Sequence, residues 1–449
     1  MKKEVKIGLE IHGYLATKEK LFCECIADRK AEPNSNICPV CCGYPGSKPM
    51  LPNIEAVKKV VAIALLLGCK INERVIWQRK HYDWPDLPKG YQDTLSGSFG
   101  APIGVDGNFL GIEIREVHLE EDPAAWDPET GYIDYNRAGL PLVEIVTEPQ
   151  FGNAKQVREW LQQLVTAVSY IKAFPKDAGI KADVNVSTIG ERVEIKNLNS
   201  IYNIVKAIDY EIARQLATKS IERETRTYDE RKKITITMRT KELEEDYRFI
   251  PDPDLPVLCL DKEFVVSIKK SLPELPTQKI ERYVKQGINK KEASVLVSDR
   301  ELAELFEAVL KFGVDAALAA HWITIELLRV LNWNHKQLSE VCINPKHLAE
   351  LIKLVQEGKL TELKAKQILN SFVPKSFSPS KKLKETEKIS EKEIEKLCRK
   401  ILEENKKAVQ DYKAGRKEAL DFLIGKVIEA SNRRADSKIV KKFFLELLG

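Results

Sequence analysis

The 449-residue sequence lacks several motifs that would assign it at once to a large class of enzymes. It has no G-x-x-x-x-G-K-[ST] motif, which excludes a P-loop nucleotide-binding site. It has neither a G-x-S-x-G motif nor a serine- and glycine-rich run of the amidase type, so it offers no obvious nucleophile for acyl transfer. No apolar run reaches the roughly 18 residues that a membrane span needs. The sequence therefore predicts no contact with a membrane.

Composition and cysteine usage predict a globular protein of the cytoplasm. The chain is 43% hydrophobic and 31% charged, and its length suggests about two to four domains. Its first residues form a short strand pattern without the long apolar segment of a secretory signal. Nine cysteines, four of them in two close pairs, fit a reducing compartment better than a disulfide framework.

The formal net charge is only +5, but the charges are unevenly distributed. Residues 375–449 contain 20 Lys and Arg against 13 Asp and Glu, so the rest of the chain is slightly acidic. A basic C-terminal segment favours a phosphate-rich partner, although an ordinary solvated helical surface has a similar composition.

Two stretches place acidic side chains on predicted strands. Residues 5–12 alternate between apolar and polar side chains, so Glu10 and His12 share one strand face, where they could ligate a divalent cation or form ordinary hydrogen bonds. Farther along, Glu144 lies in an apolar run, and strand alternation would place Glu148 on the same face. A carboxylate buried there needs a cation, either a metal ion or a structural partner such as Arg115 or Arg137. The same stretch also holds a polar run: His118, Glu120, Glu121 and Asp122.

Two close cysteine pairs predict a metal site. Cys23 and Cys25 form the first pair, and Cys38 and Cys41 form a Cys-x-x-Cys pair about a dozen residues later, a spacing typical of tetrahedral zinc. Four thiolates leave no open position for water, so the predicted zinc ion is structural rather than catalytic.

Other segments predict polar surfaces beside these patches. Residues 79–92 predict a shaped loop whose cations Arg79, Lys80 and Lys89 could bind phosphate or carboxylate groups; the alternative is a loop packed by its own aromatic residues. Residues 181–187 and 193–200 predict strands with polar faces, which either line a wet cleft or face water. Their polar residues include Asp183, Asn185, Ser187, Glu194 and Lys196.

The sequence predicts an α+β fold in three parts. Residues 1–272 should form a domain with a mixed or antiparallel sheet and helices at 54–67, 153–172 and 201–216. Residues 273–378 should form a helical domain, and residues 379–449 a small basic helical tail with helices at 390–405, 419–431 and 438–448. The residues alone indicate a metal-dependent protein that handles phosphate groups.

Ordered sequence blocks from residue 5 to the end resemble the B subunit of the glutamyl/aspartyl-tRNA amidotransferases. The blocks are GLEIH (8–12), KLFCEC (20–25), AEPNSNICPVC (31–41), WPDLPKGYQ (84–92), HLEED (118–122), DYNRAGLPLVEIVTEP (134–149), DVNVS (183–187), EIKNLNS (194–200), ETR (224–226), DYRFIPDPDLP (246–256) and LDFLIGKVIEAS (420–431). The related archaeal E subunit carries an inserted domain for which this chain has no room. Two departures from the family pattern are Lys181, where arginine is usual, in the loop 176–181, and Asp83.

The resemblance implies a cradle domain followed by all-α helical and tail (YqeY-like) domains, the tail touching tRNA. It implies that ATP phosphorylates the side chain of Glu or Asp attached to tRNA(Gln) or tRNA(Asn), and that ammonia then displaces the phosphate. The ammonia would come from the family's A subunit, a glutaminase, while the small C subunit braces the pair. The implied cofactors are ATP, Mg²⁺ and structural Zn²⁺.

The resemblance also assigns roles to single residues. The implied Mg²⁺ ligands are Glu10, His12, Glu121 and Glu144, with Glu120 and Glu148 as alternatives. Lys80 and Lys89 would line the way in for ammonia, and the four cysteines match the zinc-binding members. The implied residues around nucleotide and metal are Asp183, Asn185, Glu194 and Lys196.

Two other functions remain open at the level of the sequence. In one, the acidic residues form a structural ion-pair network and the chain is a non-catalytic tRNA-binding module. In the other, the chain is an ATP-dependent ligase or kinase that acts on a small carboxylate.

Overall fold

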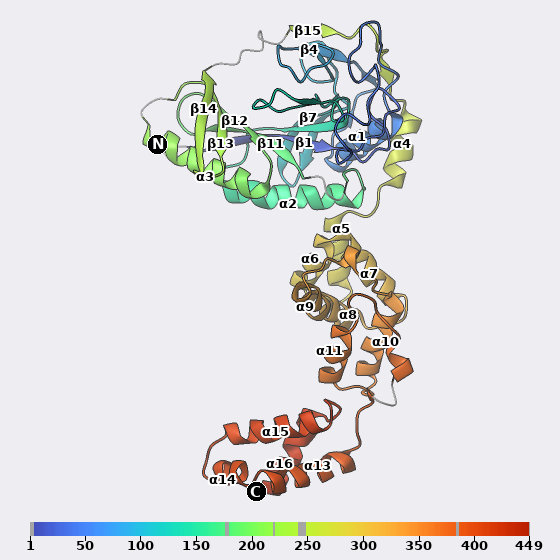
Figure 1. Ribbon diagram of the computed structural model, residues 1–449, viewed down its shortest axis with the longest axis vertical. Helices are drawn as coiled ribbons and strands as arrows, with labels where there is room; N and C mark the ends of the chain where they lie inside the picture. Colours follow the sequence, from blue (N-terminus) through green and yellow to red (C-terminus); the bar gives the residue numbers. More distant parts are fainter. Residues whose placement is uncertain (1–3, 176–178, 219–220, 241–247, 383–385, 449) are drawn as a thin grey trace. The chain divides into compact units, whose positions relative to one another are not determined.

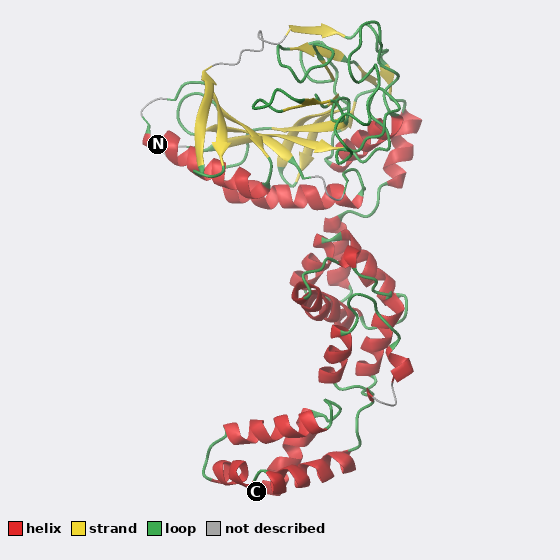
Figure 2. Cartoon of the chain, in the orientation of Figure 1, coloured by secondary structure: helices red, strands yellow, loops and turns green. Residues whose placement is uncertain are grey.

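The computed structural model describes residues 4–175, 179–218, 221–240, 248–382 and 386–448 (Figure 1). The chain divides into two compact units, Met1–Leu275 and Pro276–Gly449. The strands lie in the first unit, and the second is built from helices (Figure 2). Within the described ranges, no helix is both long enough and apolar enough to cross a membrane.

A 12-stranded sheet forms the centre of the first unit, with the order β14-β13-β12-β11-β1-β10-β7-β5-β4-β15 along its main path. On this path lie β1 (Lys6–Tyr14), β4 (Gln78–His81), β5 (Gln92–Thr94), β7 (Ile112–Glu121), β10 (Pro141–Thr147), β11 (Lys181–Ser187), β12 (Val193–Leu198), β13 (Glu224–Asp229), β14 (Ile234–Thr240) and β15 (Arg248–Pro251). Off the path, β2 (Lys70–Ile71) pairs with β6 (Gly104–Phe109), which pairs with β7. Because β12 and β13 run parallel while β1 runs antiparallel to both neighbours, the sheet is mixed, as predicted.

The remaining strands form two small ribbons. One pairs β3 (Arg74–Val75) with β16 (Leu258–Cys259), and the other pairs β8 (Ala125–Trp126) with β9 (Ile133–Asp134).

Strand β1 shows how the sheet separates an apolar face from a polar one. Ile7, Leu9 and Ile11 are buried, whereas Glu10 and His12, on the alternate positions, are only half-buried. The apolar residues join one hydrophobic core with residues of α2 (Ala154–Tyr170) and α3 (Ile201–Ala217), which run along one side of the sheet (Figure 1). These helices remove the apolar face from water, and the polar face is left for binding groups.

Most predicted elements of the first unit are present. The helices predicted at 54–67, 153–172 and 201–216 are α1 (Ile54–Leu66), α2 and α3, and the polar strands are β11 and β12. The prediction of one continuous loop over 79–92 is wrong at its ends. Arg79 and Lys80 lie in β4 and pair with β5, because this short segment is held in the sheet by its neighbours β5 and β15.

Helix α4 (Lys262–Ser271) also lies in the first unit, and the second unit is helical, as predicted after residue 273. Its described helices are α5 (Pro276–Lys285), α6 (Lys290–Ser298), α7 (Arg300–Leu310), α8 (Ala316–His321), the π-helix η2 (Trp322–Leu327), α9 (Leu328–Trp333), the 3-10 helix η3 (Leu338–Glu340), α10 (Pro345–Gln356), α11 (Glu362–Asn370), the 3-10 helix η4 (Pro379–Lys382), α13 (Glu391–Glu404), α14 (Lys406–Lys413), α15 (Glu418–Ala430) and α16 (Ser437–Leu448). The helices predicted at 390–405, 419–431 and 438–448 are α13, α15 and α16, and α14 was not predicted.

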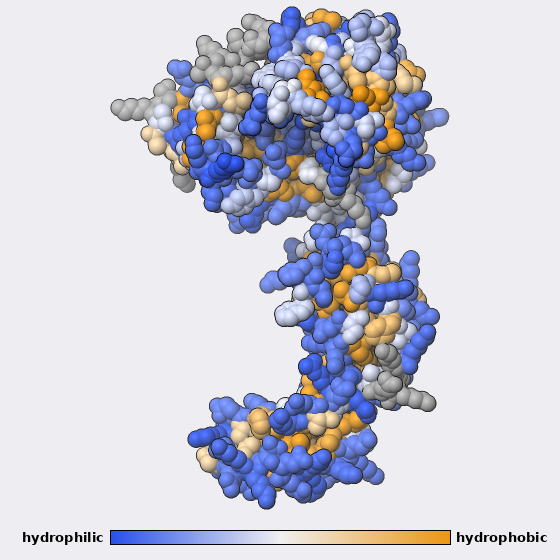
Figure 3. Space-filling model, in the orientation of Figure 1, coloured by the Kyte–Doolittle hydropathy of each residue, from blue (hydrophilic) through white to orange (hydrophobic). Residues whose placement is uncertain are grey.

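The C-terminal helices have a hydrophobic core of their own, which includes Ile394, Leu423 and Phe444. Hydrophilic side chains dominate the visible surface around them (Figure 3). A separate tail domain beginning at residue 379 remains a prediction.

Candidate functional site

A row of polar side chains crosses five adjacent strands on the face of the sheet that carries Glu10 and His12. The strand register creates the row, since His12 lies opposite Glu144 and Glu10 lies opposite Asp183. Cross-strand partners share a face and lie close enough to interact. From β7 to β12, the row contains Glu120, Glu144, His12, Glu10, Asp183, Asn185, Glu194 and Lys196.

Two groups within the row have the spacing of metal ligands. In the first triad, His12, Glu120 and Glu144 each offer one ligand atom, and these atoms lie within 4.8 Å of one another. In the second triad, Glu10, Asp183 and Glu194 do the same. One imidazole and two carboxylates form a donor set that suits a divalent cation, and three carboxylates suit a hard cation such as Mg²⁺.

Neighbouring imidazoles and carboxylates favour the charged forms of Glu144 and His12 in the first triad. Burial opposes ionisation of Glu144, but His118 and His12 outweigh burial and lower the pKa of this carboxyl group. Burial also opposes the charged form of His12, and the carboxylates of Glu144 and Glu120 outweigh it, so the pKa of His12 is raised. The triad therefore contains a carboxylate that is ionised at neutral pH beside an imidazole.

Two other carboxyl groups of the row are poised near neutrality. Burial, followed by the charge of Glu144, raises the pKa of Glu10 to about 7. The same two causes raise the pKa of Glu120 to about 7. A bound cation would stabilise the ionised forms of these buried carboxyl groups. The raised pKa values therefore point to the same kind of ligand as the donor set does, a divalent cation.

His118 extends the row beyond the predicted residues. It lies opposite Glu144 across β7 and β10 and is completely buried. Its Nε2 is 3.6 Å from Glu144 Oε2, and neither ring nitrogen has a hydrogen-bond partner among the described residues. Glu144 is thus flanked by an imidazole on each side, His12 on β1 and His118 on β7.

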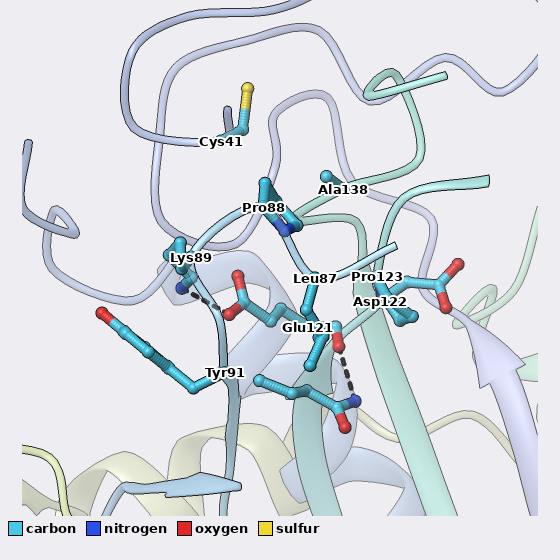
Figure 4. Close-up of a pocket in the computed structure, with 11 residues that line it drawn as sticks. Cys41, Leu87, Pro88, Lys89, Tyr91, Glu121, Asp122, Pro123 and Ala138 are labelled. Carbon is cyan, nitrogen blue, oxygen red and sulfur yellow. Dashed lines mark hydrogen bonds and ion pairs between the residues drawn. The ribbon is translucent and has the colours of Figure 1, made fainter. Parts of the chain in front are cut away.

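The structure does not bring Glu121 together with the other three predicted Mg²⁺ ligands. Adjacent residues on a strand face opposite sides, so Glu121 points away from the row that holds Glu120. Its carboxylate forms an ion pair with Lys89 and accepts a hydrogen bond of 3.0 Å from the Asp93 backbone N–H. Both charged groups line a small pocket with Tyr91 (Figure 4). In the row, Glu120 occupies the place that the resemblance gave to Glu121.

The two predicted ammonia-path lysines lie in different surroundings. The pKa of Lys89 is raised because the carboxylates of Glu121 and Asp93 outweigh its burial, and its Nζ lies 2.6 Å from Asp93 Oδ2. Lys80, on β4, is instead close enough to the row to help lower the pKa values of Glu120 and Glu144. Lys80 therefore lies near the row, and Lys89 lines the pocket.

Glu148 also lies apart from the row. The pairing of β10 with β7 shifts register at Thr147, and the half-exposed Glu148 carboxylate receives two hydrogen bonds from Arg115, at 2.8 and 3.1 Å. Arg137 pairs with Asp122 at 3.3 Å. The arginines proposed as structural partners of Glu144 thus bind other carboxylates.

The residues assigned to nucleotide and metal all lie on β11 and β12 near Glu10. The side-chain amide of Asn185 donates a hydrogen bond of 3.0 Å to Glu10 Oε1. Lys196 Nζ lies 3.1 Å from Glu194 Oε1 and 3.7 Å from Asp183 Oδ2. The loop departure at 176–181 falls partly on residues 176–178, which lie outside the described residues.

The four predicted zinc ligands converge. Cys23, Cys25, Cys38 and Cys41 each place a sulfur within 4.8 Å of the others. The pKa of Cys41 is lowered to about 4, chiefly because the Cys23 thiol donates a hydrogen bond to its sulfur. Four sulfurs at this spacing, one of them already favoured as a thiolate, fit a tetrahedral zinc ion.

The sequence analysis named His118 in a polar run but gave it no role, and it gave Glu120 only as an alternative metal ligand. The alternation of Val117 and Leu119 with polar neighbours was the available signal, because it puts His118 and Glu120 on one face and Glu121 on the other. That signal was overridden by the position carried over from the resemblance.

The fold and site define a two-unit protein whose N-terminal sheet carries an acidic row suited to divalent cations. Residues 5–266 match the family model described as the GatB/GatE catalytic domain, and residues 304–448 match the one described as the GatB domain. A relative from Methanocaldococcus jannaschii, named as the B subunit of aspartyl/glutamyl-tRNA(Asn/Gln) amidotransferase, is 44% identical, with 99% of this chain and 98% of the relative aligned.

A protein of the same name from Methanopyrus kandleri is 40% identical, with 99% of each chain aligned. The chain therefore belongs to the family of aspartyl/glutamyl-tRNA(Asn/Gln) amidotransferase B subunits.

Proposed function

We propose that this chain uses ATP to activate the side-chain carboxylate of Glu or Asp carried by tRNA, and then converts it to the amide. Its relatives are named as B subunits of an aspartyl/glutamyl-tRNA(Asn/Gln) amidotransferase. The observation that carries the proposal is the first triad, in which three ligand atoms from β1, β7 and β10 lie within 4.8 Å of one another. A cytoplasmic location, where aminoacyl-tRNA is used, belongs to the same proposal.

A magnesium ion would be held by His12, Glu120 and Glu144, with Glu10 beside them. The fit rests on the donor types and on the raised pKa values of Glu10 and Glu120. It also rests on His118, which lies behind Glu144 and whose ring nitrogens lack a hydrogen-bond partner among the described residues. When bound, the ion supplies charge neutralisation and orientation of phosphate oxygens.

The chemistry needs positioning more than a protein nucleophile. The amino acid's carboxylate oxygen attacks the γ-phosphorus of ATP and ADP leaves, so the carboxylate becomes an acyl phosphate. Ammonia then attacks the acyl carbon and inorganic phosphate leaves with the electron pair of the broken C–O bond, giving the amide after loss of a proton. Asp183, Asn185, Glu194 and Lys196 would orient the nucleotide, a role in which fixed geometry accounts for most of the rate.

Ammonia would reach this site from a glutaminase partner, the A subunit of the complex, with the C subunit bracing the pair. Lys89 lies in the small pocket with Glu121, and Lys80 lies by the row, so the two lysines could line successive parts of the path. The basic C-terminal segment would bind tRNA through phosphate contacts.

A structural zinc ion on Cys23, Cys25, Cys38 and Cys41 completes the proposal. The cysteines connect the chain just after β1 to the segment before α1. Zinc bound there would stabilise a region of the chain in which the structure has few long regular elements.

The test compares Glu144→Gln with Glu148→Gln in the assembled amidotransferase complex. With misacylated tRNA and ATP but no ammonia donor, the unchanged protein should release ADP and form the acyl phosphate. Glu144→Gln should lower this rate by about 100-fold or more, because it removes a charged ligand of the metal ion that would neutralise and orient the phosphate oxygens. Glu148→Gln should leave it nearly unchanged, since Glu148 pairs with Arg115 outside the row.

Two outcomes would favour the other functions. Retained phosphorylation in Glu144→Gln, with normal tRNA affinity, would show that the acidic row is structural. Phosphoryl transfer would then take place elsewhere in the complex, and this chain would be a tRNA-binding module. Equal amidation of free glutamate or aspartate and of the tRNA-bound form would indicate a ligase for small carboxylates.

A further inference from the structure

A cluster of basic side chains lies in the helical unit, where α11 contacts the turn that follows α15. The Thr361 hydroxyl links the two segments, because it donates a hydrogen bond to the Arg433 carbonyl and accepts one of 3.2 Å from the Lys364 backbone N–H. The carbonyl of the next residue, Arg434, accepts a bond of 3.2 Å from the Ile389 N–H. These bonds hold the backbones of Lys364 and Arg433 close together, and Arg434 follows directly.

Lys364 is a buried lysine without a carboxylate partner in the described part of the chain. The residue is only 6% exposed, and its Nζ donates a hydrogen bond of 3.1 Å to the neutral side chain of Gln367. Burial, followed by the charges of Arg434 and Arg433, lowers the pKa of Lys364. A buried ammonium is costly unless an anion meets it. The charges that act on this one are positive, so the cluster favours an anion.

The two arginines also have donors for an anion. Arg434 uses its Nε in a hydrogen bond of 2.9 Å to the Glu387 carbonyl, and the exposed Arg433 guanidinium forms no hydrogen bond or ion pair with any described residue. The pKa of Glu393 is lowered chiefly by Ser390 and in smaller part by Arg434. The Glu393 carboxylate is bound to the N-terminus of α13, where it accepts hydrogen bonds of 2.9 and 2.8 Å from the Ser390 N–H and hydroxyl.

A second lysine on the same helix shows the contrasting arrangement. Lys366 Nζ lies 2.8 Å from Glu362 Oε1 and 2.9 Å from Glu326 Oε1, and its hydrogen bonds to these carboxylates raise its pKa. Helix α11 thus carries one lysine that two carboxylates neutralise and another, Lys364, that pairs with no carboxylate of the described residues. The contrast indicates that Lys364 is placed for an anion from outside the chain.

We propose that Lys364, Arg433 and Arg434 bind one phosphate group of the tRNA backbone, at the contact between α11 and the turn after α15. The inference rests on the proposed function, in which the amino acid is carried by tRNA. Guanidinium groups match phosphate oxygens with paired N–H donors, and an ammonium adds a compact charge. Because Lys364 precedes the basic C-terminal segment, the site would bind tRNA to the preceding helices as well as to that segment.

A phosphate within a polyanion fits this place better than a single free anion. The segment 375–449 contains 20 Lys and Arg against 13 Asp and Glu, so the positive excess extends beyond the three residues of the cluster. Such an excess attracts a chain of phosphates, because each neutralised phosphate releases counterions. The cluster would therefore hold one phosphate of a longer contact.

The experiment measures tRNA binding by the assembled complex across a range of salt concentrations. Lys364→Met combined with Arg433→Met should lower the affinity by about tenfold or more, since it removes charged hydrogen-bond donors. The slope of log affinity against log salt concentration should fall by about 0.7–0.9, the value for one phosphate contact. Lys366→Met is the matched control and should change neither, because Lys366 is already neutralised. A fall of about 1.4–1.8 would indicate two separate phosphate contacts and overturn the assignment to one group.

Thermal unfolding of the same complexes separates binding from a structural role. Lys364→Met removes a buried ammonium and keeps most of the apolar stem, so it should weaken tRNA binding while the Tm stays unchanged or rises. Lys366→Met breaks two ion pairs and should not raise the Tm. A lower Tm with unchanged tRNA affinity in Lys364→Met would show that Lys364 only supports the fold, and it would overturn the inference.

Inorganic phosphate distinguishes a free anion from the tRNA backbone. If the double variant lost thermal stabilisation by inorganic phosphate but kept its tRNA affinity, the site would take a free anion and the inference would be overturned. Weaker assembly of the complex with normal tRNA affinity would assign the site to an acidic protein partner and overturn it as well. In both cases phosphorylation of the tRNA-bound amino acid would persist, so the proposed function would stand. An unchanged complex that bound no tRNA would remove both.

Discussion

Nε2 of His118 lies 3.6 Å from Oε2 of Glu144, its cross-strand neighbour, and both ring nitrogens of this fully buried histidine lack a hydrogen-bond partner within the described residues. An unsatisfied buried polar group costs about 1–3 kcal/mol. A small movement would bring the imidazole N–H into hydrogen-bonding range of the carboxylate. His118 is therefore placed to orient Glu144 once that carboxylate binds a metal ion.

Replacing His118 should weaken metal binding more than it weakens the fold. His118→Asn is expected to lower the affinity for Mn²⁺ by about tenfold, because partners behind metal ligands typically contribute 10–100-fold. The measurements are a Mn²⁺ titration followed by electron paramagnetic resonance, and the Tm of the metal-free protein. The exposed His335 serves as control, and His335→Asn should change neither. An unchanged Mn²⁺ affinity in His118→Asn would show that His118 only fills space.

Replacing Glu120 and its neighbour Glu121 one at a time should separate a role in metal binding from a role in stability. Glu120→Gln is expected to lower Mn²⁺ affinity by at least about tenfold, since it removes a charged ligand of the first triad. Glu121→Gln should leave Mn²⁺ affinity unchanged and destabilise the protein by about 1–3 kcal/mol, because it takes a charged partner from the nearly buried Lys89. Titration calorimetry and denaturant unfolding check the two effects. The opposite pattern would place Glu121 in the row.

The metal-free row should make stability and metal affinity depend on pH. The pKa values of Glu10 and Glu120 are raised from 4.5 to about 7 by burial and by Glu144. Between these values the folded chain holds more protons than the unfolded chain, so the free energy of unfolding falls as pH rises from about 4.5 to 7 and then levels off.

Metal binding should show the matching trend, because Mn²⁺ must displace those protons. Its affinity is expected to fall as pH is lowered from 8 to 6, by up to about tenfold per pH unit for each proton displaced. Calorimetry in two buffers of different ionisation enthalpy measures the number of protons released. Release of no protons at pH 6 would contradict the assignment of Glu10 and Glu120 to the row.

Removing zinc should unfold the cysteine region. Elemental analysis is expected to find one zinc ion per chain, and Cys38→Ser should lose it and lower the Tm, because a structural zinc contributes its binding free energy to folding. Cys42→Ser is the matched control, since Cys42 lies beside Cys41 but outside the four-cysteine cluster. Zinc retained in Cys38→Ser would show that the ion binds elsewhere.

Deleting residues 379–449 should weaken binding to tRNA in a salt-dependent way. This segment carries most of the C-terminal excess of positive charge. Its loss is expected to reduce the slope of log affinity against log salt concentration by about 0.7–0.9 for each phosphate contact removed. Filter binding across a range of salt concentrations measures the slope, and Mn²⁺ binding by the first unit should persist. An unchanged slope would place the tRNA contacts in other parts of the chain.

Much of the candidate site could be predicted because its signals are local. The two-residue spacing of Glu10 and His12 puts both on one strand face in any register, and the spacing of the four cysteines allows them to converge around one ion. The helices that cover the apolar face follow from their own hydrophobic periodicity.

The sequence by itself thus determined that Glu10 and His12 share one face of β1 and where the long helices of the chain lie. Only the tertiary structure decided that Glu120 meets His12 and Glu144, that His118 lies behind Glu144, and that Lys196 lies against the second triad. The physical reason is that strand pairing joins segments far apart in the chain. The register in which β7, β10, β1, β11 and β12 pair decides which side chains become neighbours. A local sequence pattern does not specify that register.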